Sequence, residues 1–484
     1  MKHSLDKLYI YFLFLIIVLF STLTLSISVN KKFAADELEH VHSAWYIENN
    51  HVPYSDFFEH HHPLLWYLIL PFLLLFDYSA KTLIAMRLMI FILTAGIGFF
   101  TYLITKKITK STEAGFTSVI LLLSVVVFIK RAVEIRPDVP QVFLGLASIY
   151  YLLIFFQSKE NKYMIFGGLS LAVSFLFLQK AIFLLIAYLF IFVFKLFRRE
   201  LPIKSVFYFN ICFSLPVLFF LGYLIISGSF NEYIAANWIL NKPFLGISSP
   251  LAILEKTGIL TDVNTLFWLF SAVSILWILF SKKTNGDLRA IAFVGLVLFS
   301  SIFFFECSYV YTQYLMPAIP LLSIAIAYFL KISCDRLNIS VIGKIVVIII
   351  FIFIPLYQMV HLGSGKIKRK TWIHQLTVIT FVIQSSDDSD LIYACSPTVN
   401  LFRHDLRYLW FYPISFQNSI KRAGERIYNI LIRDKNEDYD ICELIKDRKP
   451  KFITKCGIKD CPSLKGLYSS TAYRNLYIRN IEQR

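Results

Sequence analysis

Long apolar runs recur along this chain, and they constrain its fold more than any other feature. The first, at 8–29, reads LYIYFLFLIIVLFSTLTLSISV and is long enough to cross the hydrocarbon core of a bilayer, about 30 Å thick. Hydrophobic residues make up 57% of the 484 residues, more than soluble domains carry. The pattern predicts a polytopic α-helical membrane protein. The first run is longer than the apolar part of a signal peptide and lacks a small-residue cleavage site, so we expect an uncleaved helix.

Eleven such runs predict eleven spans, with the N-terminus inside and the C-terminus outside. Every inside loop then carries at least two Lys or Arg, as the positive-inside rule requires. The apolar run at 63–77 is too short to span, so we expect an interfacial helix within a first external loop, 30–81. Counting it as a span would place most basic clusters outside. The predicted spans are 8–29, 82–104, 113–129, 139–156, 163–178, 181–194, 205–227, 263–280, 290–305, 312–330 and 345–360.

The basic excess follows from this topology. Forty-eight Lys and Arg against 32 Asp and Glu give a formal net charge of +16, but the basic residues gather in the predicted inside loops, so no nucleic-acid partner is predicted. Composition changes near 361, which divides the chain into a transmembrane domain, 1–360, and a small external α/β domain, 361–484. Cys456 and Cys461 are candidates for a disulfide bond if that domain is periplasmic.

The segment 36–66 concentrates ionisable side chains beside the membrane, including six of the ten histidines. Asp36 and Glu37 open it, and Glu59, His60 and His61 lie near its end. Acidic residues are also favoured at the start of any helix, so the first pair could simply begin one. His and Glu are good zinc ligands, but adjacent residues need partners elsewhere to complete a site. We therefore expect structural or substrate contacts from these histidines and predict no metal site.

Other polar residues lie at the outer ends of predicted spans. Arg136 and Asp138 precede the fourth span, Lys180 lies at the mouth of the sixth, and Tyr314 lies at the mouth of the tenth. A carboxylate can act as a general base toward an attacking hydroxyl or amine, and basic side chains can neutralise a phosphate leaving group. Lys180 could instead snorkel and Tyr314 could be an interfacial anchor. Together the residues suit transfer from a lipid-phosphate donor, with Asp36 as the first candidate base.

In this order the residues resemble the membrane-embedded C-type glycosyltransferases. The branch they resemble includes the dolichyl-phosphate-mannose–protein mannosyltransferases, the aminoarabinose transferase of lipid A and the lipopolysaccharide-core transferases of rhizobia. Asp36 and Glu37 resemble the acidic pair of the first external loop, and Asp138 sits where the second external loop carries an acid. Residues 52–66, VPYSDFFEHHHPLLW, are similar to the family's PYxDFFEHHPPLLW, and residues 311–320, YTQYLMPAIP, are similar to its late YLLPxxP helix.

The resemblance implies a polyprenyl-phosphate-linked sugar as donor, inversion at the anomeric carbon, and an active site on the periplasmic side of a bacterial inner membrane. It implies that Asp36 is the base or orients the acceptor, that Asp138 assists, and that Glu59 and His60 lie near the donor phosphate. Some relatives use a divalent ion and others do not, so the cofactor stays open. Two departures stand out: His62 replaces a more usual Pro, and Gln313 replaces a basic residue that often precedes the Tyr.

We therefore predict an inverting glycosyltransferase whose acceptor is lipid A or core, a surface polysaccharide or a protein. Two other hypotheses remain open. A transporter or flippase of lipid-linked saccharides would need ionisable residues inside its spans, and a non-enzymatic membrane scaffold would depend on its C-terminal domain. The predicted catalytic residues are Asp36 and Asp138, and the predicted substrate-binding residues are Glu37, Glu59, His60, His61, Arg136, Lys180 and Tyr314.

Overall fold

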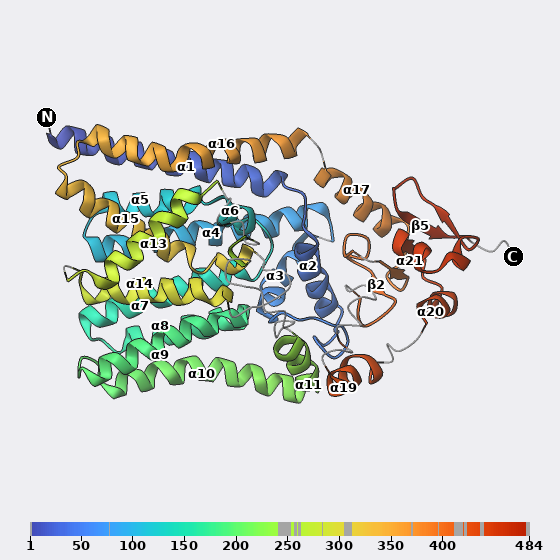
Figure 1. Ribbon diagram of the computed structural model, residues 1–484. Coiled ribbons are helices and arrows are strands. Elements are labelled where there is room, and N and C mark those ends of the chain that lie inside the picture. The colour runs from blue at the N-terminus through green and yellow to red at the C-terminus, as the bar shows by residue number, and fades with distance from the viewer. Residues whose placement is uncertain are drawn as a thin grey trace. The chain divides into compact units, whose positions relative to one another are not determined.

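The protein is mainly helical and divides into two compact units (Figure 1). The first comprises Met1–Asn30, Arg87–Phe219 and Pro243–Lys368, and the second comprises Lys31–Met86, Phe220–Lys242 and Arg369–Arg484. The computed structural model describes residues 2–76, 78–240, 253–255, 259, 263–282, 284–303, 312–368, 371–394, 396–410, 420, 424–435 and 440–480.

Long apolar helices build the first unit and confirm the predicted polytopic helical class. α1 packs against α5 and α16, and α7 packs against α8. Figure 1 shows α1 and α16 running side by side. Two of its helices, α4 and α10, also contribute residues to the second unit. The helices of the first unit are α1 (Lys2–Asn30), α4 (Ala80–Thr109), α5 (Thr112–Ser124), α6 (Val126–Ala132), α7 (Asp138–Ser158), α8 (Lys162–Phe177), α9 (Ile182–Phe197), α10 (Ile203–Ile226), α13 (Thr265–Phe280), α14 (Gly286–Ser300), α15 (Ile319–Arg336) and α16 (Val341–Lys368).

Within the described residues, each predicted span coincides with a helix or a bent pair of helices; residues 304–305, the end of the ninth predicted span, lie outside them. The count of eleven is not confirmed. Seven described helices are long and apolar enough to cross a membrane, and the pair α5–α6 brings the number to eight. The helices α8 and α13 have 16 residues each, which is short for a crossing. The predicted start of the tenth span at 312 is wrong, since Thr312–Leu315 forms a separate turn, η4. α15 begins instead at Ile319, with Pro320 in its first turn, where the missing N–H of Pro costs no helical hydrogen bond.

The predicted span 113–129 is not one straight helix. The helices α5 and α6 meet at a bend of 76° around Val125. Asn264 satisfies backbone groups on either side of the bend: its Oδ1 accepts from the Val126 N–H and its Nδ2 donates to the Ser124 carbonyl, both at 2.9 Å. Irregular backbone at membrane depth needs such partners because lipid supplies none. The bend directs the chain into 131–138, which carries the polar residues described below.

The second unit contains a five-stranded sheet, which confirms the predicted small α/β fold of the C-terminal part. The strand order is β2-β1-β3-β5-β4, with β1 parallel to β2 and β3, and β5 antiparallel to β3 and β4. β1 and β3 lie in the apolar stretches 391–394 and 451–454 of the sequence. The strands are β1 (Leu391–Tyr393), β2 (His404–Asp405), β3 (Phe452–Thr454), β4 (Tyr468–Ser470) and β5 (Leu476–Arg479).

Helices cover both faces of this sheet. α17 (Thr371–Gln384) packs on one face through Val378 and Val382. α20 (Ile441–Arg448) and α21 (Lys455–Asp460) pack on the other through Ile445 and Ile458. Alternate side chains of a strand point to opposite faces, so short apolar strands can bury both.

The first external loop belongs to the same unit as this sheet. Its Phe58 lies in an apolar core with Leu409 and Leu431 of the C-terminal part. A helix over Leu64–Phe76 confirms the short helix predicted there, while its interfacial position stays a prediction. The remaining elements of the second unit are α2 (Ala35–Glu48), α3 (Leu64–Phe76), α11 (Phe230–Tyr233), η2 (Ile234–Leu240), α19 (Glu425–Tyr428) and η5 (Asn429–Arg433).

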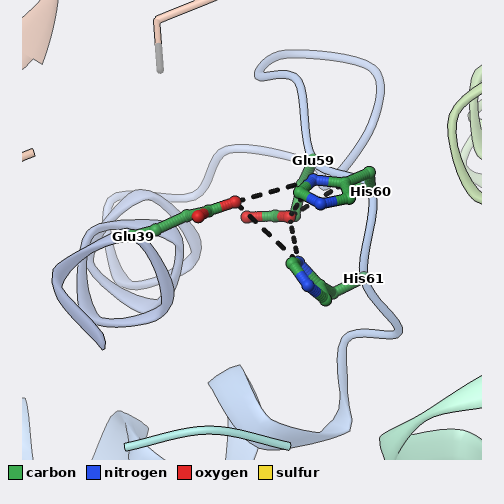
Figure 2. Close-up of side chains that lie close together, drawn as sticks. All are labelled: Glu39, Glu59, His60 and His61. Atoms are coloured by element: carbon green, nitrogen blue, oxygen red, sulfur yellow. Dashed lines mark hydrogen bonds and ion pairs between the residues drawn. The ribbon is translucent and has the colours of Figure 1, made fainter. Parts of the chain in front are cut away.

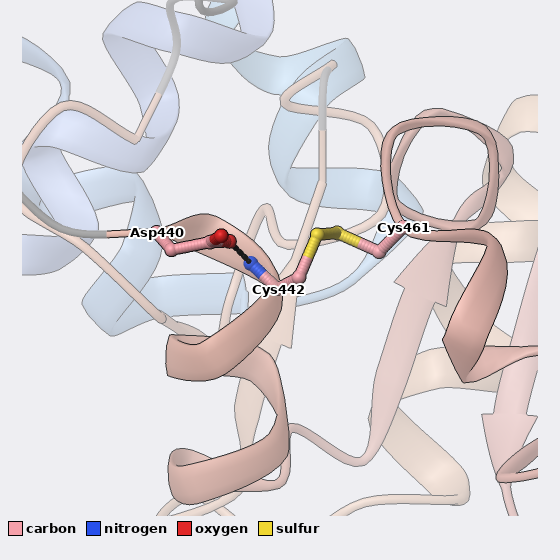
Figure 3. The surroundings of a disulfide bond; sticks show 3 residues. All are labelled: Asp440, Cys442 and Cys461. Carbon is pink, nitrogen blue, oxygen red and sulfur yellow. Dashed lines mark hydrogen bonds between the residues drawn. A yellow bond between two sulfur atoms is a disulfide. The ribbon is translucent and has the colours of Figure 1, made fainter.

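A disulfide joins Cys442 in α20 to Cys461, which follows α21 (Figure 3). The candidate pair Cys456–Cys461 is therefore not formed, and Cys456 is itself disulfide-bonded. Asp440 fixes the start of α20, because its Oδ1 accepts from the Cys442 N–H at 2.7 Å. Spacing in the sequence could not reveal this pairing, because α20 and α21 meet only when both pack on one face of the sheet.

Candidate functional site

The helix α2 carries the acidic start of the first external loop. Asp36 and Glu37 lie in its first turn, as acids at a helix start often do. The buried Glu37 accepts a hydrogen bond from the Ala34 N–H at its Oε1, at 2.9 Å, and so caps the helix. Asp36 is only partly buried. A helix-starting role is thus visible for Glu37, and the predicted substrate and catalytic roles of the pair stay predictions.

Four side chains converge where α2 meets the end of the loop: Glu39, Glu59, His60 and His61 (Figure 2). The Nδ1 atoms of both histidines face the two carboxylates. His61 Nδ1 lies 2.8 Å from Glu59 Oε1 and 3.8 Å from Glu39 Oε1. His60 Nδ1 lies 3.4 Å and 3.6 Å from the same two oxygens. Glu59, His60 and His61 were predicted from the sequence; Glu39 was not.

The carboxylate of Glu59 is fully buried but well supported. Its Oε2 accepts from the Ser43 hydroxyl at 3.0 Å and its Oε1 from the His60 N–H at 2.8 Å. Burial raises its pKa, but hydrogen bonds and charge from His60 and His61 outweigh that effect and hold the pKa well below its usual range. Glu59 is therefore an ionised carboxylate inside the unit.

The backbone of the loop is fixed from two sides. Tyr54 donates from its hydroxyl to the His61 carbonyl at 2.7 Å. With its amide nitrogen turned toward the loop, Asn237 of η2 donates to the carbonyls of His60 (3.0 Å) and His61 (3.2 Å). These hydrogen bonds fix the backbone that carries the two imidazole rings, and they involve the carbonyl oxygens and not the ring nitrogens.

The helix α2 is also held by the edge strand β2. His42 contacts the Leu401 carbonyl through Nδ1 at 2.9 Å and Asp405 Oδ2 through Nε2 at 2.6 Å. Both ring nitrogens of His42 therefore have a hydrogen-bonding partner. Tyr46 donates to the same Asp405 oxygen at 2.8 Å. Asn400 donates to the other oxygen of Asp405. Sequence reasoning missed this link, because nothing in the sequence pairs positions 42 and 405.

A second group of predicted residues meets in the first unit. Asp138 is the first residue of α7, Lys180 lies in the turn η1 (Gln179–Ala181), and Tyr314 lies in η4. Arg136 Nε lies 3.3 Å from Asp138 Oδ2, and Lys180 Nζ lies 3.6 Å from Asp138 Oδ1. The Lys180 ammonium sits 3.7 Å from the centre of the Tyr314 ring, a cation–π contact. The four residues therefore form one contiguous group, and their roles stay predictions.

Two residues that were not predicted extend this group. Glu134 Oε2 lies 3.0 Å from Arg131 Nη1 and 4.0 Å from Arg136 Nη1. The side chains of Glu134, Arg136 and Asp138 are at most 5% exposed. Buried charges of both signs persist only when paired, so the segment that follows α6 gathers a paired polar network inside the first unit. The signal in the sequence was the dense charge of 130–138.

Comparison with known proteins supports the predicted resemblance. Residues 60–225 match a family model described as dolichyl-phosphate-mannose-protein mannosyltransferase. No match was found among curated proteins.

Solved structures match over nearly the whole chain. The crystal structure of ArnT from Cupriavidus metallidurans bound to undecaprenyl phosphate is 11% identical, with a TM-score of 0.67, covering 97% of this chain and 98% of that one. The archaeal oligosaccharyltransferase AglB from Archaeoglobus fulgidus, in complex with an inhibitory peptide and a dolichol-phosphate, is 10% identical, with a TM-score of 0.55, covering 98% and 75%. The chain thus has the fold of these C-type membrane glycosyltransferases, and the predicted resemblance is confirmed.

Proposed function

We propose that this protein is an inverting glycosyltransferase that moves a sugar from a polyprenyl-phosphate donor to an acceptor on the outer side of the membrane. The family-model match and the two structural likenesses support the class of reaction, since the matched structures contain lipid phosphates. The observation that carries the proposal is the group around Asp138. Arg136 and Lys180 both contact that one carboxylate and so present two cations at a single point.

Two cations beside one carboxylate suit a leaving phosphate. As the bond between the anomeric carbon and the phosphate oxygen breaks, negative charge grows on the phosphate, and Arg136 and Lys180 are placed to neutralise it. The Lys180 side chain is 16% exposed and so is accessible to a substrate phosphate, whereas the Asp138 side chain is only 3% exposed. Asp138 orients both cations and limits the cost of burying them.

The acceptor hydroxyl or amine requires a base. Asp36 has a partly exposed carboxylate in the first turn of α2, a position where acidic side chains are favoured. In the proposed step the acceptor oxygen or nitrogen forms a bond to the anomeric carbon from the face opposite the phosphate. Its proton passes to Asp36, and polyprenyl phosphate leaves with the bonding electron pair. The configuration at the anomeric carbon is therefore inverted.

We place the reaction on the periplasmic side of a bacterial inner membrane. The basic loops predicted to be cytoplasmic support this orientation. The disulfide between Cys442 and Cys461 supports it independently, since disulfides persist in oxidising compartments. The acceptor is lipid A or core, a surface polysaccharide or a protein.

The test starts with lipid and glycan profiles of a strain lacking the gene, which name the missing sugar and its acceptor. The purified wild-type protein and Asp36→Asn are then compared in lipid nanodiscs with that donor and acceptor. We expect Asp36→Asn to insert normally and to lose transfer by at least about 100-fold, the lower range for a general base. Asp447→Asn, whose parent side chain is 80% exposed, is the matched control. Full activity of Asp36→Asn would exclude Asp36 as the base, and an unchanged profile in the deletion strain would exclude the function.

A further inference from the structure

We propose that Glu39, Glu59, His60 and His61 form a zinc site that joins the first external loop to α2. The four candidate ligand atoms all lie within 4.8 Å of one another. They come from two places in the chain, one from the helix and three from the loop, as Figure 2 shows. Glu39 is the partner from elsewhere that adjacent loop residues need in order to complete a site.

The distances between the ligand atoms fit a tetrahedral ion. Zinc bound by imidazole nitrogen and carboxylate oxygen at about 2.0–2.2 Å requires ligand atoms roughly 3.3–3.6 Å apart at the corners of a tetrahedron. The four nitrogen–oxygen distances are 2.8, 3.4, 3.6 and 3.8 Å, which bracket that range. The two remaining separations, nitrogen to nitrogen and oxygen to oxygen, are within 4.8 Å, so side-chain rotations that shorten them toward about 3.6 Å bring all four atoms onto one ion.

The charges of the four side chains also suit a divalent cation. Two carboxylates whose oxygens lie within 4.8 Å repel each other, and both side chains are at most 3% exposed. One divalent ion balances Glu39 and Glu59 while both imidazoles stay neutral, so the site as a whole carries no net charge. Two imidazole nitrogens with two carboxylate oxygens favour Zn²⁺ over Mg²⁺, which prefers oxygen ligands alone.

The surroundings are those of a prepared site. Ser43 donates from its hydroxyl to the Glu59 oxygen that does not face the histidines, as outer-shell groups do at metal sites. Tyr54 and Asn237 hold the backbone of His60 and His61. The side chains of His60 and His61 are 24% and 15% exposed, which leaves an entry path on the imidazole side.

The ion would set the position of the helix start. Asp36, Glu39 and Ser43 follow one another at spacings of three and four, so they lie along one face of α2. A zinc ion on Glu39 fixes that face against the loop, one turn from Asp36. Asp36 does not bind the ion in this proposal. The proposal concerns metal binding and does not rest on the transfer reaction.

The experiment measures metal directly on the full-length protein in nanodiscs, purified with a tag that contains no histidine. After chelation and zinc addition, elemental analysis should find zinc equimolar with protein. The double variant Glu39→Gln/His61→Gln should bind zinc at least about 100-fold more weakly. The matched control is Glu48→Gln/His51→Gln, because Glu48 ends the same helix and His51 lies in the same loop with a 34% exposed side chain.

A second measurement needs no variant, so misfolding cannot obscure it. Cobalt bound to the wild-type protein should give the intense visible absorption of a tetrahedral site, and zinc should displace it. X-ray absorption on the zinc form should show a shell of nitrogen and oxygen near 2.0–2.1 Å with imidazole scattering. Substoichiometric zinc in the wild type, or equal zinc affinity in the double variant and its control, overturns the proposal. A weak octahedral cobalt spectrum overturns it as well.

Discussion

Replacing Asp405 by Ala tests how strongly the C-terminal sheet holds the helix α2. The Asp405 carboxylate, whose side chain is 3% exposed, accepts from His42 at 2.6 Å and from Tyr46 at 2.8 Å, and also from Asn400. His42 is completely buried and has acceptors at both ring nitrogens. Removing the carboxylate therefore leaves the buried His42 ring, Tyr46 and Asn400 without their shared partner.

The loss of stability caused by Asp405→Ala follows from these contacts. Leaving a buried polar group without its partner costs about 1–3 kcal/mol, so losing the bonds from His42 and Tyr46 should destabilise the docking of α2 by about 2–6 kcal/mol. Since about 1.4 kcal/mol corresponds to a factor of ten, local opening of α2 should become roughly 30-fold to 10⁴-fold more frequent. The effect is local, so it should be read from α2 itself and not from a global melting temperature.

Hydrogen exchange followed by mass spectrometry on the protein in nanodiscs measures this opening. Peptides covering Ala35–Glu48 should exchange faster by the factor above, while peptides of α7 should not change. The control is Asp388→Ala, which removes an ion pair with Arg403 (3.0 Å) whose carboxylate is 86% exposed. Such a pair contributes at most about 1 kcal/mol, or roughly fivefold. If α2 exchanges equally in both variants, the buried pair does not hold the helix and the reasoning is wrong.

Two further predictions concern charge and pH. Lys180→Met keeps the length of the side chain but loses the cation at Asp138, so transfer in nanodiscs should fall about 10²–10³-fold. The control Lys162→Met, which removes an exposed ion pair with Glu160, should leave transfer unchanged. Near-wild-type activity of Lys180→Met would show that Lys180 does not contact the phosphate. Burial, with the charges of His51 and His42, lowers the pKa of His404, so the unfolded chain binds more protons and stability should fall as pH drops through roughly 6.5. His404→Gln should flatten the pH dependence of hydrogen exchange in β2, and an unchanged slope would contradict this cause.

Apolar length and basic loops were enough to predict the helical architecture. Within the described residues, the predicted spans coincide with helices, or with the bent pair α5–α6, because lipid supplies no partners for the backbone of an apolar run. Two features of these helices depend on interactions that hydropathy does not register. The side chain of Asn264 stabilises a bend of 76° between α5 and α6, and α15 begins at Ile319, with Pro320 in its first turn, and not at 312.

The candidate site was predictable in part. Arg136, Asp138, Lys180 and Tyr314 could be grouped because span ends on one side of a membrane lie at similar depth, and in the structure they are in contact. The dense charge of the first loop pointed to Glu59, His60 and His61. The partnership of Glu39 with them was not predicted, because it depends on which face of α2 turns toward the loop.

The position of α2 argues against a separate role for the C-terminal part. Neighbouring faces of this one helix meet two different partners: Glu39 and Ser43 contact the loop end at Glu59, and His42 and Tyr46 contact Asp405 of β2. The sheet that carries β2 therefore helps to fix the helix that begins with the proposed base. A scaffold whose function lay in the C-terminal domain alone would not need Asp405 of that domain to contact a buried histidine 363 residues earlier, in the first loop. The same contact gives a glycosyltransferase a physical reason to retain this domain, because the geometry of its first external loop depends on it.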